Sequence, residues 1–237
     1  MSDQLDFLIR QLPNLLWGFP NNRPGGLVLS VLLSAGAIAA GFVLAAVLGF
    51  AHHSRFAIVR FLAGRVVWLV RGIPLIVLLV LLFQVLGTGI ILGIELSAFW
   101  AAAVTLTLYA AAYQGDIVRA GIAAVPAQLV DDARLLGASR ATVVRTITVP
   151  YALRVTRPAL VTQAITIFKD SSVVVVLGVV DLTTTARIAL GSDIANAPFW
   201  VATYLTVGAL YWVVAFSLAK AVRPRGGPRL APEVAIS

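Results

Sequence analysis

The sequence lacks cysteine and contains only two histidines and two lysines. Without cysteine there is no disulfide, thiolate metal site or thiol nucleophile. The histidines, His52 and His53, are adjacent, which leaves little for acid–base catalysis or for sharing one metal ion. Neither Lys169 nor Lys220 follows a glycine, so the chain has no phosphate-binding Gly-x-x-x-x-Gly-Lys loop. We therefore expect no catalytic residues, no metal site and no nucleotide site within this chain.

Charge is also scarce. Charged residues make up 12% of the 237 residues and hydrophobic residues 60%, against about 25% and 45–50% in typical soluble domains. A soluble domain of this length cannot bury so much apolar surface. The composition predicts an all-α polytopic membrane protein. In a soluble protein the net charge of +8 would indicate nucleic acid; in a membrane protein it indicates arginines held on one side of the bilayer, so no nucleic-acid partner is expected.

About five stretches are long and apolar enough to cross about 30 Å of hydrocarbon as helices. These predicted spans are Gly26–Phe50, Val66–Leu86, Ala98–Gln114, Pro158–Val180 and Pro198–Ala219.

With five spans, basic residues divide unequally between the two sides of the membrane. Thirteen lie in Ala51–Arg65, Arg119–Arg157 and Lys220–Ser237, and three (Arg10, Arg23 and Arg187) lie on the other side. The positive-inside rule places the first set in the cytoplasm. We therefore expect a multi-pass inner-membrane protein with its N-terminus outside and its C-terminus in the cytoplasm.

The chain is expected to have three parts. Residues 1–25 form an extracytoplasmic lead, in which Leu5–Leu12 has the spacing of a short interfacial helix before Pro13. Residues 26–222 form the transmembrane domain, whose first span has small residues four apart, typical of close bundle packing or of a dimer face. Residues 223–237 have the composition of a disordered cytoplasmic tail, whose arginines are expected to contact membrane lipid.

The cytoplasmic segment 120–157 is the longest connection between spans. Pro126 suits the first turn of a helix, on which Leu129, Ala133 and Leu136 would form one face and Asp131 would reach Arg134. Gly137 suits a left-handed helix end. Ser139 would cap a second short helix that stops at Pro150. These two bent helices either dock into another protein or form a connector packed on their own bundle.

This segment resembles the coupling loop of permease subunits of ATP-binding cassette (ABC) importers. That family's pattern is Glu-Ala-Ala, three residues, Gly, nine residues, Ile, any residue, Leu, Pro. Here it reads Asp131-Asp132-Ala133, Gly137 and Ile147-Thr148-Val149-Pro150. Asp131, Asp132 and Val149 depart from the pattern, which leaves open how closely the docking contacts match.

Three further segments, in the same order, are similar to the polar amino-acid branch of that family. They are residues 71–75 (Arg-Gly-Ile-Pro-Leu), 111–122 (Ala-Ala-Tyr-Gln-Gly-Asp-Ile-Val-Arg-Ala-Gly-Ile) and 169–173 (Lys-Asp-Ser-Ser-Val). The resemblance implies the type I importer (MetI-like) permease fold. It also implies one half of a translocation pathway for polar amino acids across the bacterial inner membrane.

The resemblance also implies partners. These are a dimer of cytoplasmic ATP-binding subunits, which would hold ATP and Mg, a second permease subunit, identical or paralogous, and an extracytoplasmic solute-binding protein. This chain would hold no cofactor. The residues implied to couple to the ATPase are Gln128, Asp131, Asp132, Ala133, Arg134, Gly137, Ile147 and Pro150.

Charges within the predicted spans mark a candidate translocation pathway or gate. Arg71 and Pro74 belong to a stretch that either snorkels to the interface or acts as a hinge. Lys169 and Asp170 fall near mid-span, where charge is costly. A helix break there, with Asp170 or Ser171 capping a second half-helix, would line a cavity. The candidate pathway residues are Arg71, Pro74, Lys169, Asp170, Ser171 and Ser172, with a purely structural polar network as the alternative.

Two other functions are alternatives to an importer permease. An ion-coupled secondary transporter acting without an ATPase is the main alternative, motivated by Lys169 and Asp170. A membrane-embedded enzyme is opposed by the near-absence of catalytic side chains.

Overall fold

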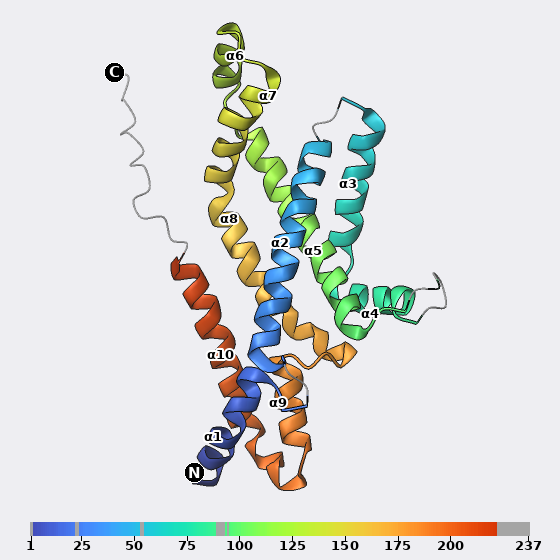
Figure 1. The fold of residues 1–237 in the computed structure, drawn as a ribbon, viewed down its shortest axis with the longest axis vertical. Coiled ribbons are helices and arrows are strands. Elements are labelled where there is room, and N and C mark those ends of the chain that lie inside the picture. The colour runs from blue at the N-terminus through green and yellow to red at the C-terminus, as the bar shows by residue number, and fades with distance from the viewer. Residues whose placement is uncertain (1, 22–23, 53–54, 89–92, 94, 222–237) are drawn as a thin grey trace.

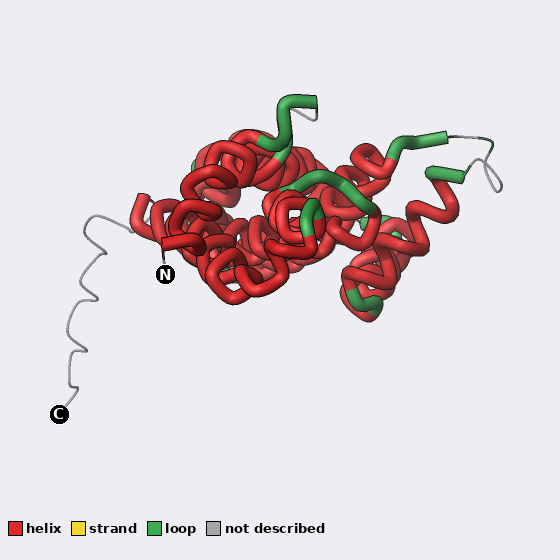
Figure 2. Tube along the Cα trace, turned by 90° about the horizontal axis from the view of Figure 1, so that it is seen from below, coloured by secondary structure: helices red, strands yellow, loops and turns green. Residues whose placement is uncertain are grey.

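The structure is a computed structural model that describes residues 2–21, 24–52, 55–88, 93 and 95–221. Over these residues the regular secondary structure is helical, with one isolated bridge between Gly26 and Asp181 (Figures 1 and 2). The predicted all-α fold class is confirmed. The tail 223–237 lies outside the described residues.

The helices form an elongated bundle. At one end lie α6 and α7, and at the other lie α1 and α9 (Figure 1). The elements are α1 (Ser2–Trp17), α2 (Gly26–His52), α3 (Ala57–Gly72), α4 (Leu75–Leu86), α5 (Ala98–Ala123), α6 (Ala127–Leu135), α7 (Arg140–Val143), a π-helical turn η1 (Val144–Thr148), α8 (Val149–Asp170), a 3₁₀ segment η2 (Ser171–Leu177), α9 (Leu182–Gly191), a 3₁₀ segment η3 (Ile194–Phe199) and α10 (Trp200–Ala221).

Three helical runs of the described chain are long and apolar enough to cross a membrane, namely Gly26–Gly49, Arg140–Leu177 and Ile194–Lys220. The bent pair α3 and α4 makes a fourth if the two helices are counted as one broken span. The sequence also predicted a span at Ala98–Gln114. This segment belongs to α5, which is less apolar than the three runs above. α5 is long enough but packs against α2, α3, α4 and α8. A helix enclosed by other helices does not need a lipid-facing apolar surface.

The second predicted span, Val66–Leu86, is not one helix. α3 begins earlier, at Ala57, and ends at Gly72, and α4 leaves it at an angle of 110°. Pro74 explains the break, because a proline disfavours helical backbone in the preceding residue, here Ile73, which has extended φ and ψ of −102° and 130°.

The closest packing in the bundle joins α2 to α5, which run in the same direction. A Cβ atom on Gly41 would lie 2.8 Å from the Cβ of Ala110 and 3.1 Å from the backbone N of Ala111. Gly49 approaches Val118 equally closely. The small residues of α2 thus serve bundle packing, as in one of the two sequence interpretations. Gly36, on the exposed side of the same helix, has no atom within 4 Å of a Cβ.

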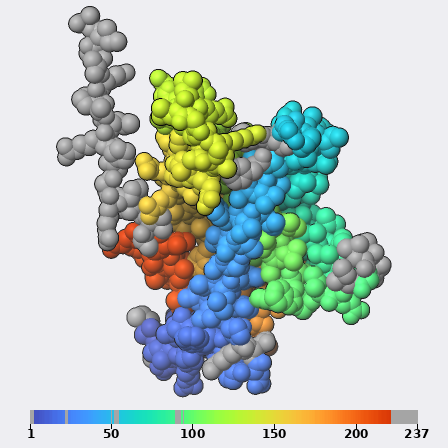
Figure 3. Space-filling model, turned by 45° about the horizontal axis from the view of Figure 1, so that its top comes forward, coloured from blue at the N-terminus to red at the C-terminus, as the bar shows by residue number. Residues whose placement is uncertain are grey.

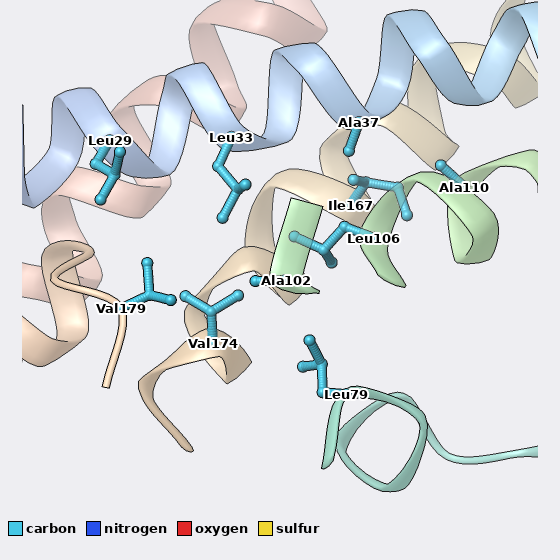
Figure 4. Packing of buried hydrophobic residues seen from close by; sticks show 10 residues of the cluster. All are labelled: Leu29, Leu33, Ala37, Leu79, Ala102, Leu106, Ala110, Ile167, Val174 and Val179. Carbon is cyan, nitrogen blue, oxygen red and sulfur yellow. The ribbon is translucent and has the colours of Figure 1, made fainter. Parts of the chain in front are cut away.

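The main hydrophobic core forms around this contact. Figure 4 shows its buried side chains converging from α2, α4, α5, α8 and the segment that follows α8. The cluster comprises Leu29, Leu33, Ala37, Leu79, Ala102, Leu106, Ala110, Ile167, Val174 and Val179. α4 is held to the bundle through Leu79, so the bend at Pro74 is packed rather than free.

A buried polar cluster fixes the α9 end of the bundle. The fully buried carboxylate of Asp181 caps α9 by accepting from the backbone N–H of Thr184 (2.8 Å) and Thr183 (3.2 Å). It also accepts from the Tyr211 hydroxyl of α10 (3.2 Å), and Ser30 of α2 accepts from the N–H of Leu182 (3.1 Å). Burial raises the pKa of Asp181, although these hydrogen bonds act in the opposite direction.

The N-terminal helix continues beyond its expected end. α1 passes through Pro13 to Trp17, whereas the sequence analysis expected a short helix before Pro13. α1 packs on α2, α9 and α10 and buries Leu15 completely. This burial stabilises the helix, in which Pro13 has no N–H to donate to the carbonyl of Ile9 in the turn before it.

Gly41→Leu tests the α2–α5 contact. The new side chain meets α5 backbone, which cannot move aside, so we expect a loss of about 1–3 kcal/mol in stability. The measurement is the thermal unfolding midpoint of purified protein in detergent. Gly36→Leu is the matched control on the same helix and should leave the midpoint nearly unchanged; equal midpoints for both variants would contradict the packing described here.

Candidate functional site

The segment between α5 and α8 forms a bent helical element, as the sequence predicts. α6 follows Pro126, and Gly137 after it has a left-handed φ of +83°, a conformation that glycine adopts without strain. The Ser139 hydroxyl accepts from the backbone N–H of Thr142 at 3.2 Å and so caps α7. We call residues 126–143 the coupling element.

The coupling element projects from the bundle rather than packing on it. Figure 3 shows α6 and α7 as a yellow-green knob at one end of the molecule. α6 has no buried residue, and its apolar side chains Leu135 and Leu136 are 85% and 89% exposed. Of the two interpretations of this segment, the structure disfavours a connector packed on its own bundle.

The second helix of this segment does not stop at Pro150, as the sequence analysis expected. The chain stays helical from Arg140 to Leu177. Pro150 falls in the first turn of α8, directly after the π-helical turn Val144–Thr148. Pro150 has no N–H to donate to the preceding turn, and the chain stays helical there through the π-helical geometry of Val144–Thr148. The coupling element is therefore joined to α8 by continuous helix.

The predicted coupling residues occupy two places. Gln128, Asp131, Asp132 and Arg134 are exposed on α6, Ala133 is half-buried there, and Gly137 forms the elbow. Ile147 and Pro150 lie further along, in η1 and the start of α8. The predicted Asp131–Arg134 ion pair does not form between these described residues. Both aspartates that depart from the family pattern are therefore available at the surface.

The second candidate region lies where α8 ends. α8 stops at Asp170, the chain tightens into η2, and Gly178 follows with a φ of +74°. The predicted span Pro158–Val180 is thus interrupted at the expected charges, but neither Asp170 nor Ser171 caps a following half-helix. The Ser171 hydroxyl instead donates back to the carbonyl of Phe168 at 2.7 Å. Lys169 is exposed, Asp170 and Ser172 are half-buried, and Ser171 is buried.

Arg71 connects the end of α3 to α5. Its guanidinium lies 2.7 Å from the carboxylate of Asp116 and 5.0 Å from the ring centre of Tyr113. Arg119 also pairs with Asp116 at 2.6 Å, which their i, i+3 spacing on one helix allows. Arg71 thus forms an ion pair directly before the break at Pro74.

Asp116 follows the uncharged segment Ala98–Gln114 of α5. Burial acts to raise the pKa of this carboxyl, but hydrogen bonds and charge from Arg119 and Arg71 outweigh it and hold the pKa below its usual range.

Sequence reasoning missed a row of polar side chains along α5. The hydroxyls of Tyr109 and Tyr113 are 3.3 Å apart, and Asp116 follows one turn further. Asp170 lies within electrostatic range of Tyr109 at the other end of the row. The signal was present in the sequence, because positions i, i+4 and i+7 share one face of a helix. We call Asp170, Tyr109, Tyr113, Arg71 and Asp116 the α5 polar row.

A bundle with apolar spans, a partly exposed polar row and a protruding element joined to one span is typical of polytopic membrane proteins of the transporter type. The chain belongs to the family described as binding-protein-dependent transport system inner membrane component, which it matches over residues 25–225.

Its relatives are amino-acid permeases. The chain is 30% identical to the arginine transport system permease protein ArtQ of Bacillus subtilis over 216 residues, covering 90% of this chain and 92% of that one. It is 28% identical to the glutamate/glutamine/aspartate/asparagine transport system permease protein BztC of Rhodobacter capsulatus over 209 residues. That match covers 88% of this chain but only 48% of BztC, so the chain spans about half the length of this relative.

Solved structures agree with the fold. The crystal structure of an amino acid ABC transporter with histidines superposes with a TM-score of 0.77 at 26% identity, covering 91% of this chain and 94% of that one. The inward-facing MetNI methionine ABC transporter superposes with a TM-score of 0.62 at 21% identity, covering 94% and 100%. The predicted MetI-like fold is therefore confirmed.

A double-mutant cycle on Arg71→Ala and Asp116→Ala tests the ion pair between α3 and α5. Since both side chains are partly exposed (41% and 32%), we expect a coupling free energy of at most about 1 kcal/mol. The measurement is the free energy of unfolding in mixed micelles. The cycle Arg71→Ala with Asp131→Ala is the control, and a coupling there as large as that for Asp116 would contradict a specific pair.

Proposed function

We propose that the chain is the permease subunit of an ABC importer and forms half of the translocation pathway for polar amino acids. A separate ATPase subunit would drive it through the coupling element. The observation that carries this proposal is the helical run from Arg140 to Asp170, which joins an exposed element at one end to the change to 3₁₀ geometry at Ser171 at the other.

The coupling element has the properties of a docking site for a rigid partner. Leu135 and Leu136 are nearly fully exposed at the elbow, next to the charged surface of α6. An apolar centre with a polar rim is typical of protein interfaces. A displacement of the elbow by the ATPase subunits, on binding or hydrolysing ATP with Mg, would pass along α8 because a helix transmits motion as a rigid body.

The pathway is proposed to follow the α5 polar row. Arg71 and Asp170 supply charges of both signs at two points along it, and Tyr109 and Tyr113 supply hydroxyls between them. Such a surface suits a zwitterionic amino acid, whose carboxylate and ammonium both need partners when they leave water. ArtQ and BztC are named as permeases for arginine and for acidic amino acids and their amides, which supports this substrate class.

The function needs partners because one chain offers only one face of such a pathway. A second permease subunit would complete it, and an extracytoplasmic solute-binding protein would deliver the amino acid. The test is reconstitution of the chain with its cognate ATPase and binding protein in proteoliposomes. Amino-acid uptake that requires internal ATP is the expected result; uptake driven by a proton or sodium gradient without ATP would favour the secondary transporter.

Leu136→Asp tests the docking site. A charge at the centre of an apolar contact must lose its water without gaining a partner, so we expect the affinity for the ATPase to fall at least about tenfold and uptake to fall with it. The measurement is co-purification of the ATPase from detergent. Ile194→Asp, at a 93% exposed position at the other end of the bundle, is the control and should retain the ATPase. Undiminished co-purification with Leu136→Asp would argue against the proposed coupling.

Cysteine labelling tests the proposed topology, with the coupling element in the cytoplasm and the N-terminus outside. Because the chain has no cysteine, Leu136→Cys and Ile194→Cys each introduce one exposed thiol. We expect a membrane-impermeant maleimide to label Ile194→Cys in intact spheroplasts and Leu136→Cys only after permeabilisation. The opposite pattern would place the coupling element outside, where a cytoplasmic ATPase subunit cannot reach it.

A further inference from the structure

A groove runs between α8 and α10, which lie side by side and antiparallel (Figure 1). Its volume is about 330 Å³, and it is lined by Leu153, Arg157, Leu160, Val161, Ala164 and Leu218. Both helices belong to runs that are apolar and long enough to cross a membrane. None of the lining residues belongs to the α5 polar row, and the groove lies between two spans, so it is open to lipid.

One end of this groove is positively charged. Arg157 is its single polar lining residue and lies two turns into α8, counted from the coupling element. Arg157 is exposed and makes no ion pair with any described residue. Arg154 lies one turn before it, and Lys220 lies at the neighbouring end of α10. α10 carries no acidic residue, and the single acidic residue of α8 is Asp170, at its far end.

The geometry points to a binding site for one anionic phospholipid, with an acyl chain in the groove and the phosphate of its headgroup on Arg157. Basic pockets between transmembrane helices on the cytoplasmic side favour anionic headgroups. An arginine near a helix end holds its charge at the interface while its stem covers apolar surface. The remaining lining residues, four of them aliphatic side chains larger than alanine, match a hydrocarbon chain. This inference goes beyond the proposed function and does not depend on it.

Charge also argues against two other occupants. A twofold contact centred on this groove would bring the same patch of two copies together, so that Arg154 and Arg157 would face their own counterparts, which is unfavourable. The chain's own last residues, 222–237, carry three arginines and one glutamate. Their net positive charge is likewise repelled by Arg157. A phosphate group is the occupant that neutralises this end of the groove.

The experiment uses the purified full chain in detergent and phosphatidylglycerol with a diazirine on its acyl chain. Photolabelling is titrated, mapped by mass spectrometry, and competed with unlabelled phosphatidylglycerol, phosphatidylcholine of the same chains, or sn-glycerol 3-phosphate. Arg157→Gln removes the charge, and Ala164→Trp fills the apolar part. Arg187→Gln and Val213→Trp are the matched controls at exposed positions outside the groove. Ala164→Leu replaces Ala164→Trp if the latter aggregates in size-exclusion chromatography.

We expect saturable labelling of residues 153–164 and 218 that phosphatidylglycerol displaces and neither phosphatidylcholine nor glycerol phosphate does. Arg157→Gln should weaken binding about fivefold, because one basic residue near an anionic headgroup contributes about that factor. Ala164→Trp should abolish the labelling, and both controls should retain it. Equal competition by phosphatidylcholine with no effect of Arg157→Gln would overturn the proposal in favour of unspecific boundary lipid. Crosslinking of a photoreactive residue at position 164 to a second protein chain would overturn it in favour of a subunit interface.

Discussion

The close contact between α2 and α5 determines the arrangement of the other helices. Gly41 and Gly49 allow the two backbones to approach until the side chains of α5 touch α2 directly. In a bilayer, where lipid is as apolar as leucine, such close packing is what holds helices together. Because α5 is fixed at the centre, it contacts α2, α3, α4 and α8 at once. Its polar row lies between α3 and the end of α8 and stays partly open, since the side chains of Arg71 and Asp116 are 41% and 32% exposed.

The two helix breaks are the second determining feature. Backbone groups that leave a helix at membrane depth need protein or water partners, because lipid offers none. The break at Ile73–Pro74 lies beside the Arg71–Asp116 ion pair. At the second break, after Asp170, the chain goes on as a 3₁₀ segment that packs on α4 and α5. Neighbouring helices therefore cover the second break, whereas Gly72 and Pro74 at the first break are exposed; both breaks lie at an end of the α5 polar row.

The joint between the coupling element and α8 connects the protruding end of the bundle to its interior. A stop at Pro150 would have separated them by a flexible connection. The π-helical turn before Pro150 keeps the chain helical, so the elbow at Gly137 and the break at Asp170 are two ends of one rod. In our proposal, a movement of the elbow by the ATPase subunits changes the position of the segment around Asp170. The opposite end of the bundle is fixed by Asp181, Tyr211 and Ser30, which tie α9, α10 and α2 together.

Some features could be predicted from local sequence patterns, because each depends on residues within one or two helical turns. They are the helical class, most span positions, the glycine elbow, the Ser139 cap and the Asp116–Arg119 pair. The bend at Pro74, the continuity through Pro150 and the partners of Arg71 and Asp181 depend on contacts between residues distant in the chain. Arg71 and Asp116 are 45 residues apart, and Tyr211 and Asp181 are 30 apart. A proline permits either a break or a continued helix: at Pro74 the chain breaks and α4 packs on the core through Leu79, whereas at Pro150 the preceding π-helical turn keeps the chain helical.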